Sequence, residues 1–157
     1  MSPGQWVLLA YRVPREPSTP RIALWRALRR LGAAQLQDGL AALPADSRTR
    51  EQLEWLADAV IDGGGQATIW LGQPGSRAQE RAIAARMRAD VGGEYVRLAE
   101  QAAAAHHAPA GARKRTLSRL RRELRRIRRR DYFHAPQDAD AEAAVDALAG
   151  SLDELPA

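Results

Sequence analysis

The chain lacks cysteine and has few aromatic residues: Trp, Tyr and Phe together supply eight of its 157 residues. The absence of cysteine excludes disulfides and thiolate metal sites, and it agrees with a reducing compartment. No basic region precedes the first apolar run, which is only about six residues long. Because that run is too short for a signal peptide or a membrane span, we expect a cytoplasmic protein without membrane contact.

Positive charge is concentrated in one stretch, residues 113–130, which reads RKRTLSRLRRELRRIRRR. Eleven of these 18 residues are Arg or Lys, and Glu123 is the one acid, so the stretch carries a formal charge of +10. The rest of the chain carries −5, and the net charge of +5 therefore comes from this stretch. A localised charge of this kind favours a localised anionic partner, with polyanions as the first candidates.

The same stretch contains an apolar seam. Leu117, Leu120, Leu124 and Ile127 recur at steps of three and four residues, which predicts an amphipathic helix rather than a disordered basic tail. We expect the seam to pack on the preceding long helix or on a second subunit.

The N-terminal half alternates between strand and helix patterns. The expected elements are a strand at 5–13, a helix from Ser18 or Thr19 to Leu31, two short strands within 33–43, a helix from Asp46 or Ser47 to about 62, and a strand at 66–71. Asp38-Gly39 between two apolar runs is a hairpin signal. The resulting order, β-α-β-β-α-β, is the ferredoxin-like arrangement. A three-stranded alternative, with residues 39–43 as a loop, remains open.

The chain becomes helical after Gly72. A long helix begins near Ser76, the basic helix follows, and a last helix covers about 138–148; from Asp131 onward there are seven acids and no basic residue. We therefore predict an α+β fold: a ferredoxin-like βαββαβ unit, residues 1–72, followed by a three-helix C-terminal extension, residues 73–157.

The basic helix is interpreted as a contact for nucleic-acid phosphates, because the guanidinium fork binds phosphate with two hydrogen bonds. No helix-turn-helix or zinc finger is visible for reading bases. One alternative is an intramolecular clamp by the acidic last helix, and another is contact with a small anion or a partner protein. The candidate DNA-binding residues are Arg113, Lys114, Arg115, Arg119, Arg121, Arg122, Arg125, Arg126, Arg128, Arg129 and Arg130.

A second basic cluster lies at the start of the first helix. Arg15 and Arg21, with Ser18 and Thr19, could hold a tetrahedral oxyanion at the helix N-terminus. Chromate, sulfate and phosphate share that shape. The alternative interpretation is a capped turn beside a solvated helix face.

Other residue types give no catalytic or metal-binding prediction. His106-His107 falls in a turn, where adjacent histidines are usually exposed polar residues, and no nucleophile–base pair or phosphate-binding loop is recognisable. We expect no cofactor and no metal, and we favour a non-enzymatic role. The four tryptophans, Trp6, Trp25, Trp55 and Trp70, are predicted to lie in the core rather than to form a base-stacking platform.

Three segments resemble a known family. They are YRVPREPSTPRIALWRALRRLGAAQLQDGLAALP (11–44), REQLEWLADAVIDGGGQATIWL (50–71) and LRRELRRIRRRDYFHAP (120–136). They are similar to the N-terminal domain of the chromate-resistance regulatory protein ChrB and, more distantly, to the ferredoxin-like domain of PaaX-type repressors, which respond to phenylacetate. The resemblance implies a cytoplasmic bacterial protein tied to chromate resistance, with the role of a regulator of transcription.

Full-length members of that family carry a second, C-terminal domain, and the chain ends at Ala157 without it. A rival hypothesis is therefore a chromate or sulfate sensor, or an accessory subunit, that acts with a separate partner protein supplying this domain. A third is a structural module whose basic helix is occupied by its own acidic tail. A homodimer is also expected, because a palindromic operator requires two-fold symmetry.

Overall fold

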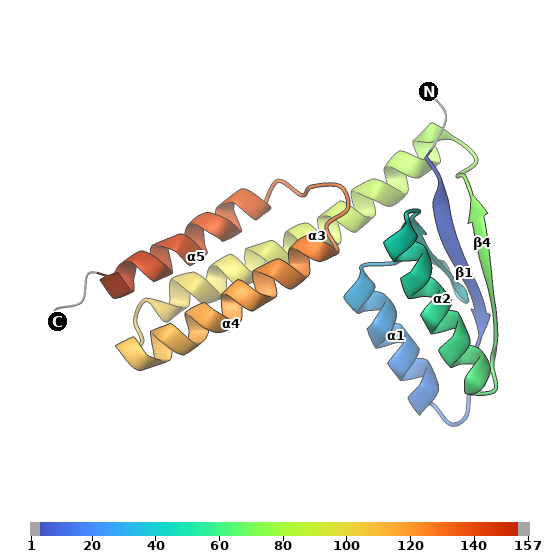
Figure 1. Cartoon of the computed structure of the whole chain (residues 1–157). Coiled ribbons are helices and arrows are strands. Elements are labelled where there is room, and N and C mark those ends of the chain that lie inside the picture. The colour runs from blue at the N-terminus through green and yellow to red at the C-terminus, as the bar shows by residue number, and fades with distance from the viewer. Residues whose placement is uncertain (1–3, 154–157) are drawn as a thin grey trace. The chain divides into compact units, whose positions relative to one another are not determined.

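The computed structural model describes residues 4–153 (Figure 1), which form two compact units. The first ends at Met87 and the second begins at Arg88. Their boundary falls inside the long helix α3 (Arg77–Ala105) rather than at residue 72, where the change of composition placed it. The first turns of α3 belong to the first unit because Glu80 binds β1: its Oε2 accepts a 2.8 Å hydrogen bond from Trp6 Nε1.

The first unit is a four-stranded antiparallel sheet with two helices on one face (Figure 1). The strand order is β2-β3-β1-β4, so the α+β class and the ferredoxin-like arrangement are confirmed. The elements are β1 (Trp6–Arg12), α1 (Thr19–Leu31), β2 (Ala34–Gln37), β3 (Leu40–Pro44), α2 (Ser47–Asp62) and β4 (Gln66–Gly72).

The hairpin between β2 and β3 turns at Asp38-Gly39, as the sequence predicts. Gly39 has φ +81°, a backbone conformation that glycine adopts without steric cost, and its carbonyl accepts a 2.8 Å hydrogen bond from Tyr11 N. Both arms pair antiparallel, with a register irregularity between Gln35 and Gln37. The three-stranded alternative is therefore wrong.

Helix ends follow local chemistry to different degrees. Asp46 caps α2 through a reciprocal pair: its Oδ1 accepts from Thr49 N at 2.7 Å, and its own N–H donates to Thr49 Oγ1 at 2.9 Å. Ser18 holds the N-cap position of α1, but its side chain makes no capping hydrogen bond. Gly32 ends α1 in a left-handed conformation, as expected.

The core of the first unit lies between the sheet and α1 and α2. Val7 and Leu9 of β1 are fully buried, whereas Leu8 and Ala10 are only half-buried, so the helices cover one face of β1. Apolar side chains from β3 and from both helices complete the core, among them Ala41, Leu43, Leu24, Leu28 and Leu53.

The prediction that the four tryptophans lie in the core is wrong for three of them. Trp6 is buried, but Trp25, Trp55 and Trp70 are 56%, 65% and 62% exposed. Trp70 pairs with Leu8 across the sheet, so both lie on the side away from Val7 and Leu9. Trp25 follows the buried Leu24 by one residue, which turns it out of the core.

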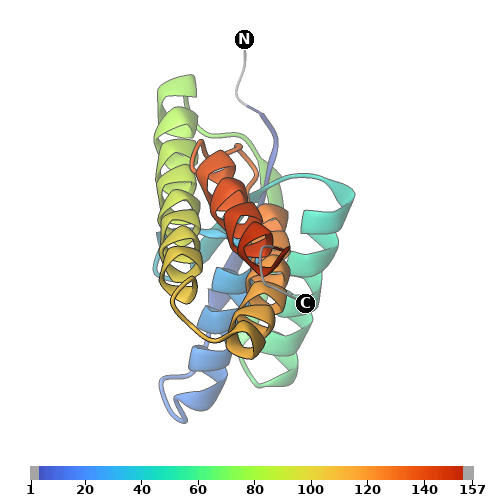
Figure 2. The same cartoon turned by 90° about the vertical axis from the view of Figure 1, so that its left-hand side faces the viewer.

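The second unit consists of three helices that lie side by side (Figure 2): the part of α3 from Arg88 onward, α4 (Ala110–Arg129) and α5 (Asp138–Asp153). The predicted basic helix is thus present, and it begins three residues earlier than expected. No helix within residues 4–153 has the length and apolarity to cross a bilayer.

Candidate nucleic-acid interface

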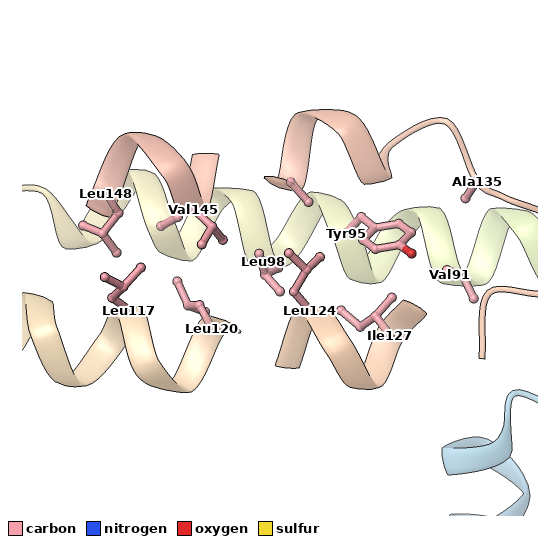
Figure 3. Packing of buried hydrophobic residues seen from close by; sticks show 12 residues of the cluster. Val91, Tyr95, Leu98, Leu117, Leu120, Leu124, Ile127, Ala135, Val145 and Leu148 are labelled. Carbon is pink, nitrogen blue, oxygen red and sulfur yellow. The ribbon is translucent and has the colours of Figure 1, made fainter. Parts of the chain in front are cut away.

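The apolar seam of α4 builds the core of the second unit. Leu117, Leu120, Leu124 and Ile127 are all buried, and Leu120 has no exposed surface. They meet Tyr95 and Leu98 of α3 and Val145 and Leu148 of α5 in one cluster (Figure 3). The expectation that the seam packs on the long helix is confirmed, and α5 supplies the other wall.

Burial of the seam turns the basic side chains outward. Nine of the eleven candidate residues are exposed, and only Arg113 and Arg130 are half-buried. A helix advances about 1.5 Å per residue, so the stretch 114–125 presents cations over roughly 16 Å. The surface is therefore a row of charges held in place by a packed helix.

The acidic helix α5 binds one end of this row. Asp138 Oδ1 accepts two hydrogen bonds from Arg128, at 2.7 and 3.0 Å, and Glu142 lies 3.3 Å from the same guanidinium. The hydrogen bond to Asp138 raises the pKa of Arg128 further above its usual value. At the other end, Arg113 Nη1 donates to Ser151 Oγ at 3.1 Å.

Helix α3 and α4 itself engage further arginines. Arg130 donates to both carboxylate oxygens of Glu94, at 2.8 and 3.1 Å. Burial lowers the pKa of Arg130, but the hydrogen bond and charge of Glu94 and the nearby Glu123 outweigh it, so that the pKa is raised. Arg119 donates to Gln101 Oε1 at 3.0 Å, and Arg126 lies 3.7 Å from Glu123.

Five cations between Arg113 and Arg128 have no such partner. Within residues 4–153, no side-chain hydrogen bond or ion pair is made by Lys114, Arg115, Arg121, Arg122 or Arg125. All five are exposed. The clamp by α5 is thus real at Arg128, whereas Arg130 is bound by Glu94 of α3. Both leave this group of five, which we call the open patch, available to an external anion.

The turn after α4 is fixed by one carboxylate. Asp131 Oδ2 accepts a 2.9 Å hydrogen bond from Tyr95 OH, and its Oδ1 accepts from Ala135 N at 3.0 Å. Burial of Tyr95, together with its bond to Asp131, raises the pKa of the phenol. Arg88 also donates to the Phe133 carbonyl oxygen at 2.9 and 3.1 Å. These contacts fix the turn that leads from α4 to α5.

The predicted oxyanion residues are only partly brought together. Arg15 and Arg21 line one hollow of the first unit, and Arg21 Nη2 donates to the Arg15 carbonyl oxygen at 2.9 Å. Ser18 and Thr19 do not line it. The structure adds residues that the sequence reasoning did not select for this site: Tyr11 and Arg12 of β1, Trp25 of α1 and Gln35 of β2.

The histidines give no metal centre. His106, His107 and His134 are exposed, and within residues 4–153 no three His, Cys, Asp or Glu side chains are grouped closely enough to hold a metal ion.

The chain is an α+β protein with a ferredoxin-like unit and a three-helix unit, and the exposed face of α4 is cationic. The chain belongs to the family described as "Protein ChrB, N-terminal", which matches residues 21–107. A relative, "Protein ChrB" of Cupriavidus metallidurans, is 29% identical over 145 residues, which cover 89% of the chain and 43% of the relative. The chain thus spans less than half the length of that relative. No solved structure matches the chain.

Proposed function

We propose that the chain is the DNA-contacting part of a ChrB-type regulator of transcription linked to chromate resistance. The observation that carries the proposal is the open patch: five exposed cations on one packed helix, without partners among residues 4–153. Membership of the ChrB N-terminal family supports the regulatory role. The resemblance described from the sequence supports the link to chromate.

The chemistry of the open patch favours phosphate. Four of its five residues are arginine, whose planar fork matches two phosphate oxygens, and each contact releases a condensed counterion from the duplex. Because the seam already fixes the helix, binding does not have to order the backbone that carries these side chains. The expected mode is sequence-tolerant contact with the backbone that positions the protein on DNA.

The test is duplex binding by the full chain and by the triple variant Arg121→Gln, Arg122→Gln, Arg125→Gln. We expect the slope of log K against log salt to become shallower by about three for the triple variant, because each lost phosphate contact removes about one unit. Binding is measured by fluorescence anisotropy on one labelled duplex between 50 and 200 mM salt, a range set by the steep part of such curves.

The matched control carries the same loss of charge elsewhere: Arg48→Gln, Arg77→Gln, Arg81→Gln, three exposed positions outside α4. It is expected to keep the slope of the wild type. Equal slopes for both triple variants would show that net charge, not the open patch, governs binding, and absence of binding by the wild type at low salt would refute the proposal.

The pairing of Arg128 with α5 predicts a smaller, opposite effect. In the double variant Asp138→Asn, Glu142→Gln, Arg128 is released, and we expect tighter duplex binding with a slope about one unit steeper. Asp140→Asn, Asp146→Asn is the control, because it removes two exposed acids of α5 that make no ion pair within residues 4–153. The same anisotropy titration compares them. If the control tightens binding equally, general repulsion rather than masking of Arg128 accounts for the gain.

A further inference from the structure

The first unit contains a second cationic site that is independent of α4. It is a hollow of about 750 Å³ formed where the end of β1, the loop that follows it, the first turns of α1 and the β2–β3 hairpin meet. That volume falls within the range of about 300–1,000 Å³ that is usual for small-molecule sites. The residues that give it chemical character are Tyr11, Arg12, Arg15, Arg21, Trp25 and Gln35.

The net positive charge of the hollow favours an anionic ligand. Three guanidinium groups, those of Arg12, Arg15 and Arg21, line it, against the single carboxylate of Asp38. Within residues 4–153 none of the three makes an ion pair, and Arg21 uses one N–H on the Arg15 carbonyl oxygen. Guanidinium forks of this kind bind phosphate oxygens in pairs.

The apolar walls of the hollow favour a ligand with a planar ring. Trp25 and Tyr11 contribute aromatic surface, and Ile22 and Leu24 contribute aliphatic surface. Trp25 is 56% exposed, and Arg29 steadies it, with its guanidinium carbon 5.0 Å from the ring centroid. An exposed indole beside cations is the arrangement on which nucleobases stack, because every base offers a π-face.

One wall of the hollow is polar, and hydrogen bonds within the first unit already order it. Gln35 Nε2 donates to Tyr11 OH at 2.8 Å and to the Gln37 carbonyl oxygen at 2.7 Å, and Tyr11 N donates to the Gly39 carbonyl oxygen. A ligand would therefore meet a preformed wall, which lowers the entropic cost of binding. A lone tetrahedral oxyanion would use the arginines but leave Trp25 and Tyr11 without contact.

From these features we infer that the hollow binds a nucleotide, with the phosphate on Arg12, Arg15 and Arg21 and the base on Trp25 and Tyr11. The inference goes beyond the proposed duplex contact, since it concerns other residues and another unit. The nucleotide could be free, or it could be an unpaired nucleotide of a single strand.

The test is calorimetry of the full chain with four probes: adenosine 5′-monophosphate, adenosine, orthophosphate and an eight-residue oligodeoxyadenylate. We expect the monophosphate to bind more tightly than adenosine or orthophosphate. Trp25→Ala should weaken its binding about tenfold or more, as loss of a base-stacking partner does. Trp55→Ala is the matched control, since Trp55 is also largely exposed, lies on α2 and does not line the hollow.

A second variant separates the two halves of the ligand. Arg15→Gln should weaken binding of the monophosphate but leave adenosine unchanged. Tighter binding of the oligonucleotide than of the monophosphate identifies a single strand as the source, and equal affinity identifies a free nucleotide.

Three results would overturn the inference: no heat with either nucleotide probe, equal binding by Trp25→Ala and the wild type, or orthophosphate binding as tightly as the monophosphate. The last would make the hollow an inorganic oxyanion site. The triple variant in the open patch should bind the monophosphate as the wild type does, so failure here and failure of the duplex proposal are distinguishable.

Discussion

Leu120→Ala is expected to lower the free energy of unfolding of the three-helix unit by about 2–5 kcal/mol, the usual cost of removing a fully buried leucine side chain. Leu120 has no exposed surface and lies at the centre of the seam between α3 and α5 (Figure 3). The measurement is hydrogen exchange of the α4 amides, with denaturant unfolding followed by far-ultraviolet circular dichroism.

We expect a loss of stability in the upper part of this range, because small side chains make up much of the surrounding core. Ala102, Ala135 and Ala141 fill positions in the same cluster and offer little side chain that could move into a cavity. Val96→Ala is the control, since Val96 lies on α3 and is 44% exposed. A loss at Leu120 no larger than that at Val96 would mean that the seam does not hold α4 in place.

Gly39→Ala should destabilise the first unit by more than its backbone conformation alone explains. A left-handed residue with a side chain costs about 1–2 kcal/mol. At Gly39 an added Cβ would also lie 2.6 Å from the Tyr11 carbonyl oxygen, so the hairpin must shift away from β1 at a further cost of about 1–3 kcal/mol.

Gly64→Ala provides the matched comparison. Gly64 has φ +91°, close to that of Gly39, but no atom lies within 4 Å of its added Cβ. The difference between the two variants therefore isolates the contact of the hairpin with β1. Tryptophan fluorescence in denaturant reports it, because all four tryptophans belong to the first unit. Equal losses would argue against this contact.

The order of the elements was predictable because local signals determine it. Asp38-Gly39 specifies a hairpin, Asp46 with Thr49 specifies a helix start, and the step pattern of Leu117 to Ile127 specifies one buried face. Each signal involves residues within about three helical turns of each other. The boundary between the units was less predictable, because it depends on the long-range bond between Glu80 and Trp6.

The pairing of the surface arginines could not be predicted from the sequence alone. Composition alone suggested that seven acids could cancel part of the basic helix, but not that Arg128 and Arg130 would be engaged while Arg121 and Arg122 stay open. That division follows from the acids of the neighbouring helices that reach each turn of α4: Asp138 of α5 reaches Arg128, and Glu94 of α3 reaches Arg130. The exposure of Trp25 was likewise not predictable, because an aromatic residue beside a buried leucine is usually assigned to the core.

The open patch has one consequence for covalent chemistry. Lys114 is the single lysine of the chain, so arginine supplies the other 23 basic side chains. Reagents and enzymes that acylate primary amines act on lysine and leave guanidinium groups untouched. Apart from the amino terminus, such chemistry has one target in this protein, an exposed residue in the second turn of α4. Acetylation there would remove one of the five open charges, and a dye attached there would sit at the edge of the proposed DNA contact.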